Sequence, residues 1–148
     1  RQIVVEARPF IAVDAQFAAV VVLASEALLA IGAMSYAPLL SAPVYDGGEC
    51  VGLLTTNAIA RWVAAELRAD GTISTGTVAD VLAHSGKLDQ PIFLRRTVTA
   101  AAAVEALSTP LPSGAVPRLA IITEHGKSTQ KPISVLGATD IPALAQAI

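Results

Sequence analysis

Two short apolar runs flank a glycine-rich turn in the first half of the chain. The runs span residues 43–45 and 50–54, and the turn is the Asp-Gly-Gly sequence at 46–48. Glycine tolerates the positive φ angles that tight hairpin turns need, so this pattern predicts two antiparallel strands.

The apolar spacing changes directly after this hairpin. Ile59, Trp62 and Leu67 fall on one face of a predicted helix, whose other face carries charge. Thr55 and Thr56 lie at the junction, where a hydroxyl can cap the first free amides of the helix. The junction therefore predicts a polar loop at a helix N-terminus, which is a favourable place for an anion.

The same order of elements recurs roughly 80 residues downstream. Residues 119–123 form an apolar strand, 125–127 a turn and 133–136 a second strand. Thr139 and Asp140 then stand as a predicted cap before a last apolar helix that reaches Ile148. The chain is therefore predicted to contain one supersecondary unit twice.

Further elements complete each unit. Residues 10–13 and 92–94 are predicted as leading strands, and residues 99–107 as an alanine-rich helix. Residues 77–82 are typical of a short capped helix, and the three prolines of 109–117 predict a loop.

The long apolar segment from Ala15 to Ala33 leaves two interpretations open. A membrane span needs about 20 predominantly apolar residues, and this segment nearly qualifies on length. Glu26 lies near its middle, however, and costs about 2.5–3.5 kcal/mol on insertion scales. We therefore favour a buried helix that contributes to an interface, without membrane insertion.

Composition restricts the possible partners. The 148 residues are 53% hydrophobic and only 15% charged, which favours burial of apolar surface in an oligomer, for which we expect a homodimer. The net charge is −2 and no basic run occurs, which argues against nucleic acid as a partner. The single Cys50 excludes an internal disulfide and fits a reducing compartment, so we expect a cytoplasmic protein.

The repeated unit resembles a known family, the tandem CBS (cystathionine beta-synthase type) domain pair, or Bateman module. The resemblance rests on Pro43-Val44-Tyr45-Asp46, on Gly52-Leu53-Leu54-Thr55 before a helix, and on the order and repetition of the elements. It implies an α/β (α+β) fold in which two β-α-β-β-α units pack as a pseudo-twofold pair. The predicted organisation is an N-terminal arm at 1–9, a first unit at 10–70, a linker with a short helix at 71–90 and a second unit at 91–148.

Metal binding and catalysis find little support. Cys50, His84 and His125 lack the close spacing of a structural zinc site. No nucleophile, base and orienting group can be assembled from the sequence, so we expect neither an enzyme nor a cofactor. An unrecognised small enzyme remains the least favoured alternative.

The resemblance implies a ligand motif of the form Gly-x-x-Thr-x-x-Asp, in which the hydroxyl contacts phosphate and the carboxylate accepts bonds from ribose hydroxyls. The first unit matches at Gly52 and Thr55 but has Ala58, with Asn57 beside it, at the acid position. The second unit matches only at Asp140, since its other motif positions are Ser134 and Gly137. Each unit thus keeps half of the pattern.

The resemblance assigns a role to each candidate. Thr55 and Thr56 would contact phosphate and Asp140 would hold the ribose, while the arginines at 95, 96 and 118 could add positive charge. Apolar residues at strand starts would face the adenine. The predicted ligand-binding residues are Thr55, Thr56, Asn57, Thr139, Asp140, Ile11, Ile92 and Arg118.

Two functions follow from these residues. The favoured one is a non-catalytic regulatory module that senses AMP, ADP, ATP or S-adenosylmethionine between its units and shifts an attached or partner effector domain. The alternative is a structural dimerisation module with ligand-free clefts, in which Thr55 and Asp140 serve only as helix caps.

Overall fold

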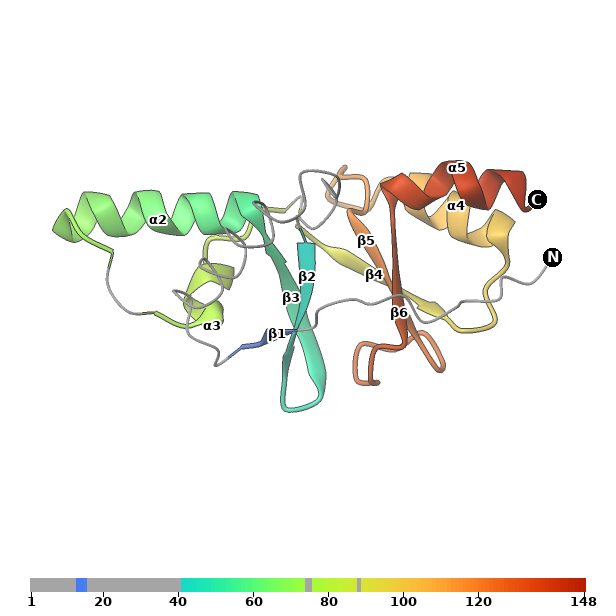
Figure 1. The fold of residues 1–148 in the computed structure, drawn as a ribbon, viewed down its shortest axis with the longest axis horizontal. Helices are drawn as coiled ribbons and strands as arrows, with labels where there is room; N and C mark the ends of the chain where they lie inside the picture. Colours follow the sequence, from blue (N-terminus) through green and yellow to red (C-terminus); the bar gives the residue numbers. More distant parts are fainter. Residues whose placement is uncertain (1–12, 16–40, 74–75, 88) are drawn as a thin grey trace, which may run out of the picture.

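The described part of the chain forms two three-stranded sheets (Figure 1). This computed structural model describes residues 13–15, 41–73, 76–87 and 89–148. The first sheet has the order β1-β2-β3, and its strands are β1 (Val13–Asp14), β2 (Ser41–Asp46) and β3 (Glu49–Thr55). The second has the order β4-β5-β6, and its strands are β4 (Pro91–Arg95), β5 (Leu119–Thr123) and β6 (Ser134–Gly137).

Both sheets have the same topology. In each, the first strand pairs parallel with the second, and the second pairs antiparallel with the third. The described helical elements are α2 (Thr56–Asp70), α3 (Val78–Leu82), α4 (Ala100–Ser108), the 3-10 turn η1 (Ala138–Asp140) and α5 (Ile141–Gln146). The predicted mixed α/β architecture with a repeated unit is confirmed.

The first hairpin forms as its sequence predicts. Gly47 and Gly48 have φ angles of 57° and 86°, which are the positive values that a two-residue hairpin turn requires. A register shift between Val44 and Tyr45 interrupts the ladder above the turn. The turn residues, more than the strand residues, fix where the chain reverses.

Threonine caps begin three of the helices. Thr55 caps α2, Thr77 caps α3 and Thr99 caps α4, each through its hydroxyl oxygen and a backbone amide three residues on. At α3 the carboxylate of Asp80 completes the exchange by accepting from the Thr77 amide at 2.7 Å. That hydrogen bond lowers the pKa of Asp80.

The last helix differs from the prediction. Asp140 stands at the N-cap position of α5, but its side chain makes no cap bond to that helix. Its Oδ2 accepts instead from the backbone N–H of Gly137 at 2.8 Å, at the start of η1. The helix then ends at Gln146, so Ile148 lies beyond it and is 71% exposed.

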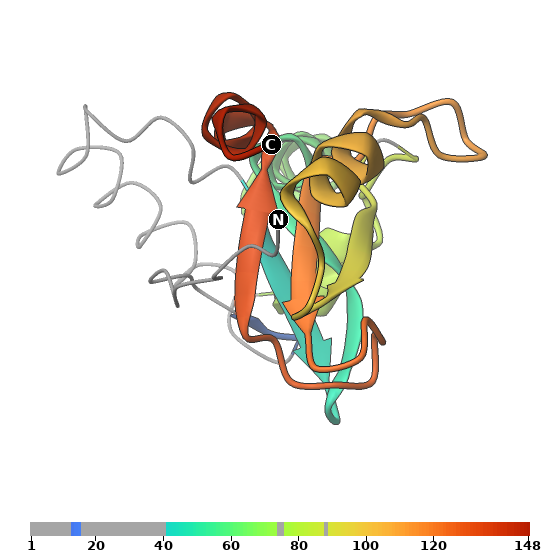
Figure 2. The same ribbon diagram turned by 90° about the vertical axis from the view of Figure 1, so that its right-hand side faces the viewer.

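The two sheets share an apolar layer. Leu53 of β3 packs with Leu119 and Ile121 of β5, and all three side chains are buried. Figure 2 shows the two sheets one behind the other, with α2, α4 and α5 along the same edge. Each unit also has its own core, one around Trp62 and one around Leu107 and Ile122.

The backbone carries contacts between distant parts of the chain. Ala15 is buried, donates to the Tyr45 carbonyl at 3.0 Å and accepts from the Ala79 amide at 2.9 Å. Across the two units, the Cys50 amide donates to the Ser128 carbonyl at 2.9 Å. The second hairpin loop is thereby tied to the first hairpin.

Several predictions concern residues outside those described. They include the arm at 1–9, the strand residues 10–12 and all but Ala15 of the predicted helix at 15–33. Within the described ranges, no helix has the length and apolar character needed to cross a membrane. The limits assigned to the two units and to the linker stay predictions.

Candidate functional site

The β3–α2 junction places a hydroxyl at the N-terminus of a 15-residue helix. Thr55 is 2% exposed, and its Oγ1 accepts from the Ala58 amide at 3.1 Å. Thr56 and Asn57 follow on the first turn and are exposed. This turn contains no acidic residue, so the positive end of the α2 dipole has no carboxylate beside it within the helix.

The β6–η1 junction places a carboxylate at the corresponding point of the second unit. Asp140 is buried and accepts from the Gly137 amide, while Thr139 beside it is exposed. Gly137 lies opposite Leu119 in the sheet register. A Cβ added to Gly137 would lie 3.7 Å from the Arg118 carbonyl oxygen, so Arg118 runs directly past this junction.

An ionic cluster of Asp89, Arg61 and Arg118 connects α2 with the start of β5. Asp89 has a fully buried side chain, and its Oδ2 accepts from Arg61 Nη1 at 3.2 Å and from the Gly86 amide at 3.1 Å. Arg118 Nε lies 3.3 Å from Oδ1, within ion-pair distance. Oδ1 has no aligned hydrogen-bond donor among the described residues, so Arg118 contributes there mainly through its charge.

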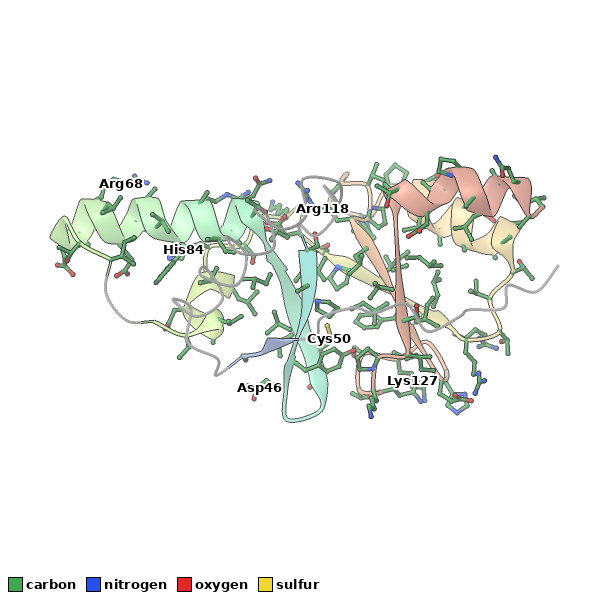
Figure 3. All side chains as sticks on the ribbon, viewed as in Figure 1. Asp46, Cys50, Arg68, His84, Arg118 and Lys127 are labelled. Atoms are coloured by element: carbon green, nitrogen blue, oxygen red, sulfur yellow. The ribbon has the colours of Figure 1, made fainter. Side chains whose placement is uncertain are left out.

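The cluster joins the two units. Arg61 belongs to α2 and Arg118 immediately precedes β5, while Asp89 comes from the segment before β4. Arg61 Nη1 also donates to the His84 carbonyl at 2.9 Å, which ties the residues after α3 to α2. Figure 3 shows Arg118 between the α2 N-terminus and the second sheet. The two arginine side chains stay 43% and 37% exposed, so each presents donors to solvent.

The structure separates the three arginines that could add charge for a phosphate. Pro91 at the start of β4 pairs with Leu119, beside Arg118, whereas Arg95 at its end pairs with Thr123. Four residue steps of a strand span about 13 Å. Arg95 and Arg96 therefore lie at the opposite end of the sheet from Arg118.

The apolar candidates have different outcomes. Ile92 is half-buried and packs against the core of the second unit together with Leu94. Ile11 lies outside the described residues. The structure thus brings Arg118 next to the Asp140 junction and links it through Asp89 to α2, whose N-terminus holds Thr55, Thr56 and Asn57.

Two titratable groups meet across the first hairpin. Tyr45 pairs with Cys50 in the register, and burial together with the Cys50 charge raises the pKa of Tyr45 to about 12. Burial also raises the pKa of Cys50, whose Sγ donates to the Gly52 carbonyl at 3.6 Å. A thiol held protonated is a poor nucleophile. No group of three or more potential metal ligands occurs in the part of the chain that the structure describes.

Sequence reasoning missed the role of Asp89. Its partners come from two other elements, and no local spacing connects an aspartate before one strand with arginines in a helix and before another strand. A carboxylate three residues before the predicted strand at 92–94 is the one available signal.

No protein-family model and no curated protein matched this chain. Solved structures did match. The crystal structure of CBSX2 in complex with AMP superposes with a TM-score of 0.56 and 17% identity, covering 93% of this chain and 87% of that one. A signal-transduction protein with CBS domains from Burkholderia ambifaria MC40-6 gives 0.57 and 14%, covering 94% and 84%.

A third structure, a CBS domain-containing protein of unknown function from Kribbella flavida DSM 17836, has a TM-score of 0.54 and 17% identity, and 95% of each chain is covered. This chain folds as a CBS domain pair. At 14–17% identity this likeness shows the fold. Ligand binding by this CBS pair depends on its own side chains.

Proposed function

We propose that this CBS pair is a non-catalytic regulatory module that binds an adenine nucleotide or a related adenosyl ligand. The site would lie along the edge that holds Thr55, the Arg61–Asp89–Arg118 cluster and Asp140. The observation that carries the proposal is this ionic cluster, in which Asp89 joins a partly exposed arginine of α2 to a partly exposed arginine beside the β6–η1 junction. AMP is present in one structure of the same fold, that of CBSX2.

The phosphate contacts would come from the first unit and the cluster. The Thr55 oxygen accepts from the Ala58 amide, which leaves the hydroxyl hydrogen to donate to a phosphate oxygen. The exposed Thr56 and Asn57 can supply further donors at the α2 N-terminus, where the helix dipole favours an anion. Arg118 contacts Asp89 through Nε, so its terminal amino groups can pair with phosphate.

The ribose contact would come from the second unit. Asp140 accepts from the Gly137 amide through Oδ2, and a carboxylate is an acceptor of the kind that ribose hydroxyls require. Its oxygens match the vicinal hydroxyls of a ribose, and Thr139 stands exposed next to it. Ile92 would face the adenine with its half-buried side chain.

Regulation would follow from differential binding. A ligand that contacts α2, the Asp89 cluster and the β6–η1 junction bridges both units and favours the arrangement in which these contacts form. That bias would pass to an attached or partner effector domain. The 53% apolar composition supports a homodimer as the working assembly.

The alternative is a structural dimerisation module, and one observation favours it. Thr55 already caps α2 and Asp140 already holds the β6–η1 turn, so both side chains have a local role without a ligand.

Thermal unfolding with AMP, ADP, ATP and S-adenosylmethionine separates the two functions. A ligand at 100 times its dissociation constant is expected to add about 2.7 kcal/mol to the free energy of unfolding. The Arg118→Gln variant should lose most of that gain, while Glu124→Gln, at a distant exposed ion pair, should keep it. If none of the four ligands at millimolar concentration moves the transition, the sensor proposal fails and the structural alternative stands.

A further inference from the structure

Cationic side chains gather at the end of the second unit opposite Arg118. Figure 3 shows Lys127 at this lower end and Arg118 at the upper one. We call this group the basic corner, and its members, all exposed, are Arg95, Arg96, Lys127 and Lys131.

The basic corner is formed by two loops that touch through their backbones. The Arg96 amide donates to the Thr123 carbonyl at 2.9 Å, which joins the end of β4 to the end of β5. A Cβ added to Gly126 would lie 3.2 Å from the Arg95 backbone nitrogen, so the β5–β6 loop runs against the end of β4. Residues distant in sequence therefore present their charges side by side.

A glutamine fixes the conformation of the β5–β6 loop. Gln130 Oε1 accepts from the His125 amide at 2.8 Å, from the buried Thr123 hydroxyl at 3.2 Å and from the Lys127 amide at 3.3 Å. The Lys127 amide also donates to Thr123 Oγ1 at 2.9 Å. The cationic side chains thus start from a preorganised backbone, which lowers the entropy lost when they bind a partner.

The corner has an excess of positive charge. It holds four of the ten Lys and Arg residues of a chain whose net charge is −2. Glu124 pairs with Arg96 at 3.2 Å, and both side chains are about half exposed. Asp46 and Glu49 pair in the first hairpin, and the Cys50 amide next to Glu49 donates to the Ser128 carbonyl next to Lys127. Figure 3 shows Asp46 apart from Lys127.

We propose that the basic corner is a docking surface for a carboxylate-rich peptide segment of a partner protein. Guanidinium groups pair with carboxylates through two parallel hydrogen bonds, and complementary charge steers and orients such an encounter. Nucleic acid fits less well because the corner contains no Phe, Tyr or Trp on which bases could stack. The surface is separate from the proposed nucleotide site, so the two can be tested independently.

Fluorescence anisotropy with a labelled decaglutamate peptide tests the proposal on the full chain. The Arg95→Gln/Lys127→Gln double variant should weaken binding by at least about tenfold at low salt, since two charge contacts are removed. The matched control is Arg68→Gln/Lys87→Gln, which removes the same two residue types from exposed positions elsewhere. The control should stay within about twofold of the unmodified chain, because the removed charges lie outside the corner.

Three results would overturn the proposal. Equal weakening by both double variants would show attraction to charge in general. Tighter binding of an oligothymidylate of the same length would assign the corner to nucleic acid. If sedimentation shows that Arg95→Gln/Lys127→Gln loses self-association while the control variant keeps it, the basic corner binds a second copy of the chain. A nucleotide-induced thermal shift that survives in the double variant would confirm that the two sites are distinct.

Discussion

At the β3–α2 junction the Thr55 hydroxyl accepts from an amide three residues further along the chain. At the β6–η1 junction the Asp140 carboxylate accepts from an amide three residues before it. The first junction leads straight into a 15-residue helix, and the second passes through a 3-10 turn into a helix of six residues. Both satisfy one backbone amide, those of Ala58 and Gly137. The repeat therefore preserves hydrogen bonding at the junction without preserving the residue that provides it.

The comparison changes how a functional residue must be tested. A variant at either junction removes a structural bond as well as any ligand contact, so loss of stability alone cannot assign a role. Only the difference between free and ligand-bound protein can do so.

The largest effect is expected where the two units share their apolar layer. Ile121→Ala should lower the free energy of unfolding by about 3 kcal/mol through lost burial and a residual cavity. Trp62, the single tryptophan, lies in the core of the first unit and reports on that unit by fluorescence. A shift of the Trp62 transition in urea would show that the units unfold together.

The control for this variant is Val116→Ala, at a side chain that is 54% exposed and expected to cost under about 0.5 kcal/mol. A circular-dichroism transition that moves while the Trp62 transition stays in place would mean that the units are independent.

A smaller effect is expected at the connection between the junctions. Asp89→Asn should lower the free energy of unfolding by about 2 kcal/mol. Breaking a fully buried ion pair costs about 3–5 kcal/mol, and the expected loss is smaller here because both arginines are partly exposed. Glu124→Gln is a matched control, since Arg96 and Glu124 are also 3.2 Å apart but exposed. It should cost under about 1 kcal/mol. Equal costs by urea denaturation would mean that burial of Asp89 adds nothing.

The junction residues themselves come next. Thr55→Val keeps the side-chain shape but removes the cap, and should cost about 1 kcal/mol, with Thr55→Ser restoring most of it. Asp140→Asn should cost about as much, because the Gly137 amide then donates to an uncharged oxygen. Thermal unfolding with and without AMP would show whether either variant also removes a ligand contact. If AMP raises the unfolding temperature of both variants as much as that of the unmodified chain, Thr55 and Asp140 have a structural role only.

The smallest effect is confined to alkaline pH. Tyr45 has a pKa raised to about 12 from 10.0, and its hydroxyl has no hydrogen-bond partner among the described residues. The unfolded chain therefore releases this proton first, so stability is full below about pH 10 and declines as the pH rises toward 12. In urea denaturation, the free energy of unfolding of the Tyr45→Phe variant should decline less over that pH range. Parallel pH profiles would contradict the raised pKa.

Local patterns were sufficient to predict much of the fold. Gly47 and Gly48 indicated the first hairpin, and Thr55, Thr77 and Thr99 marked helix starts, because turns and caps depend on neighbours in sequence. The order of the elements then indicated the repeat.

The remaining features depend on approaches between distant segments. Asp89 meets arginines from two other elements, and the amide that donates to Asp140 is that of Gly137 and not one of α5. The same limit applied to Arg95 and Arg118, which were both candidates to add charge for a phosphate but which the direction of β4 separates.

The layer formed by Leu53, Leu119 and Ile121 has a consequence for the history of the chain. A half released on its own would expose one wall of this layer to water and invite aggregation. A chain cut between the two units is therefore expected to yield halves that aggregate more readily than the intact pair.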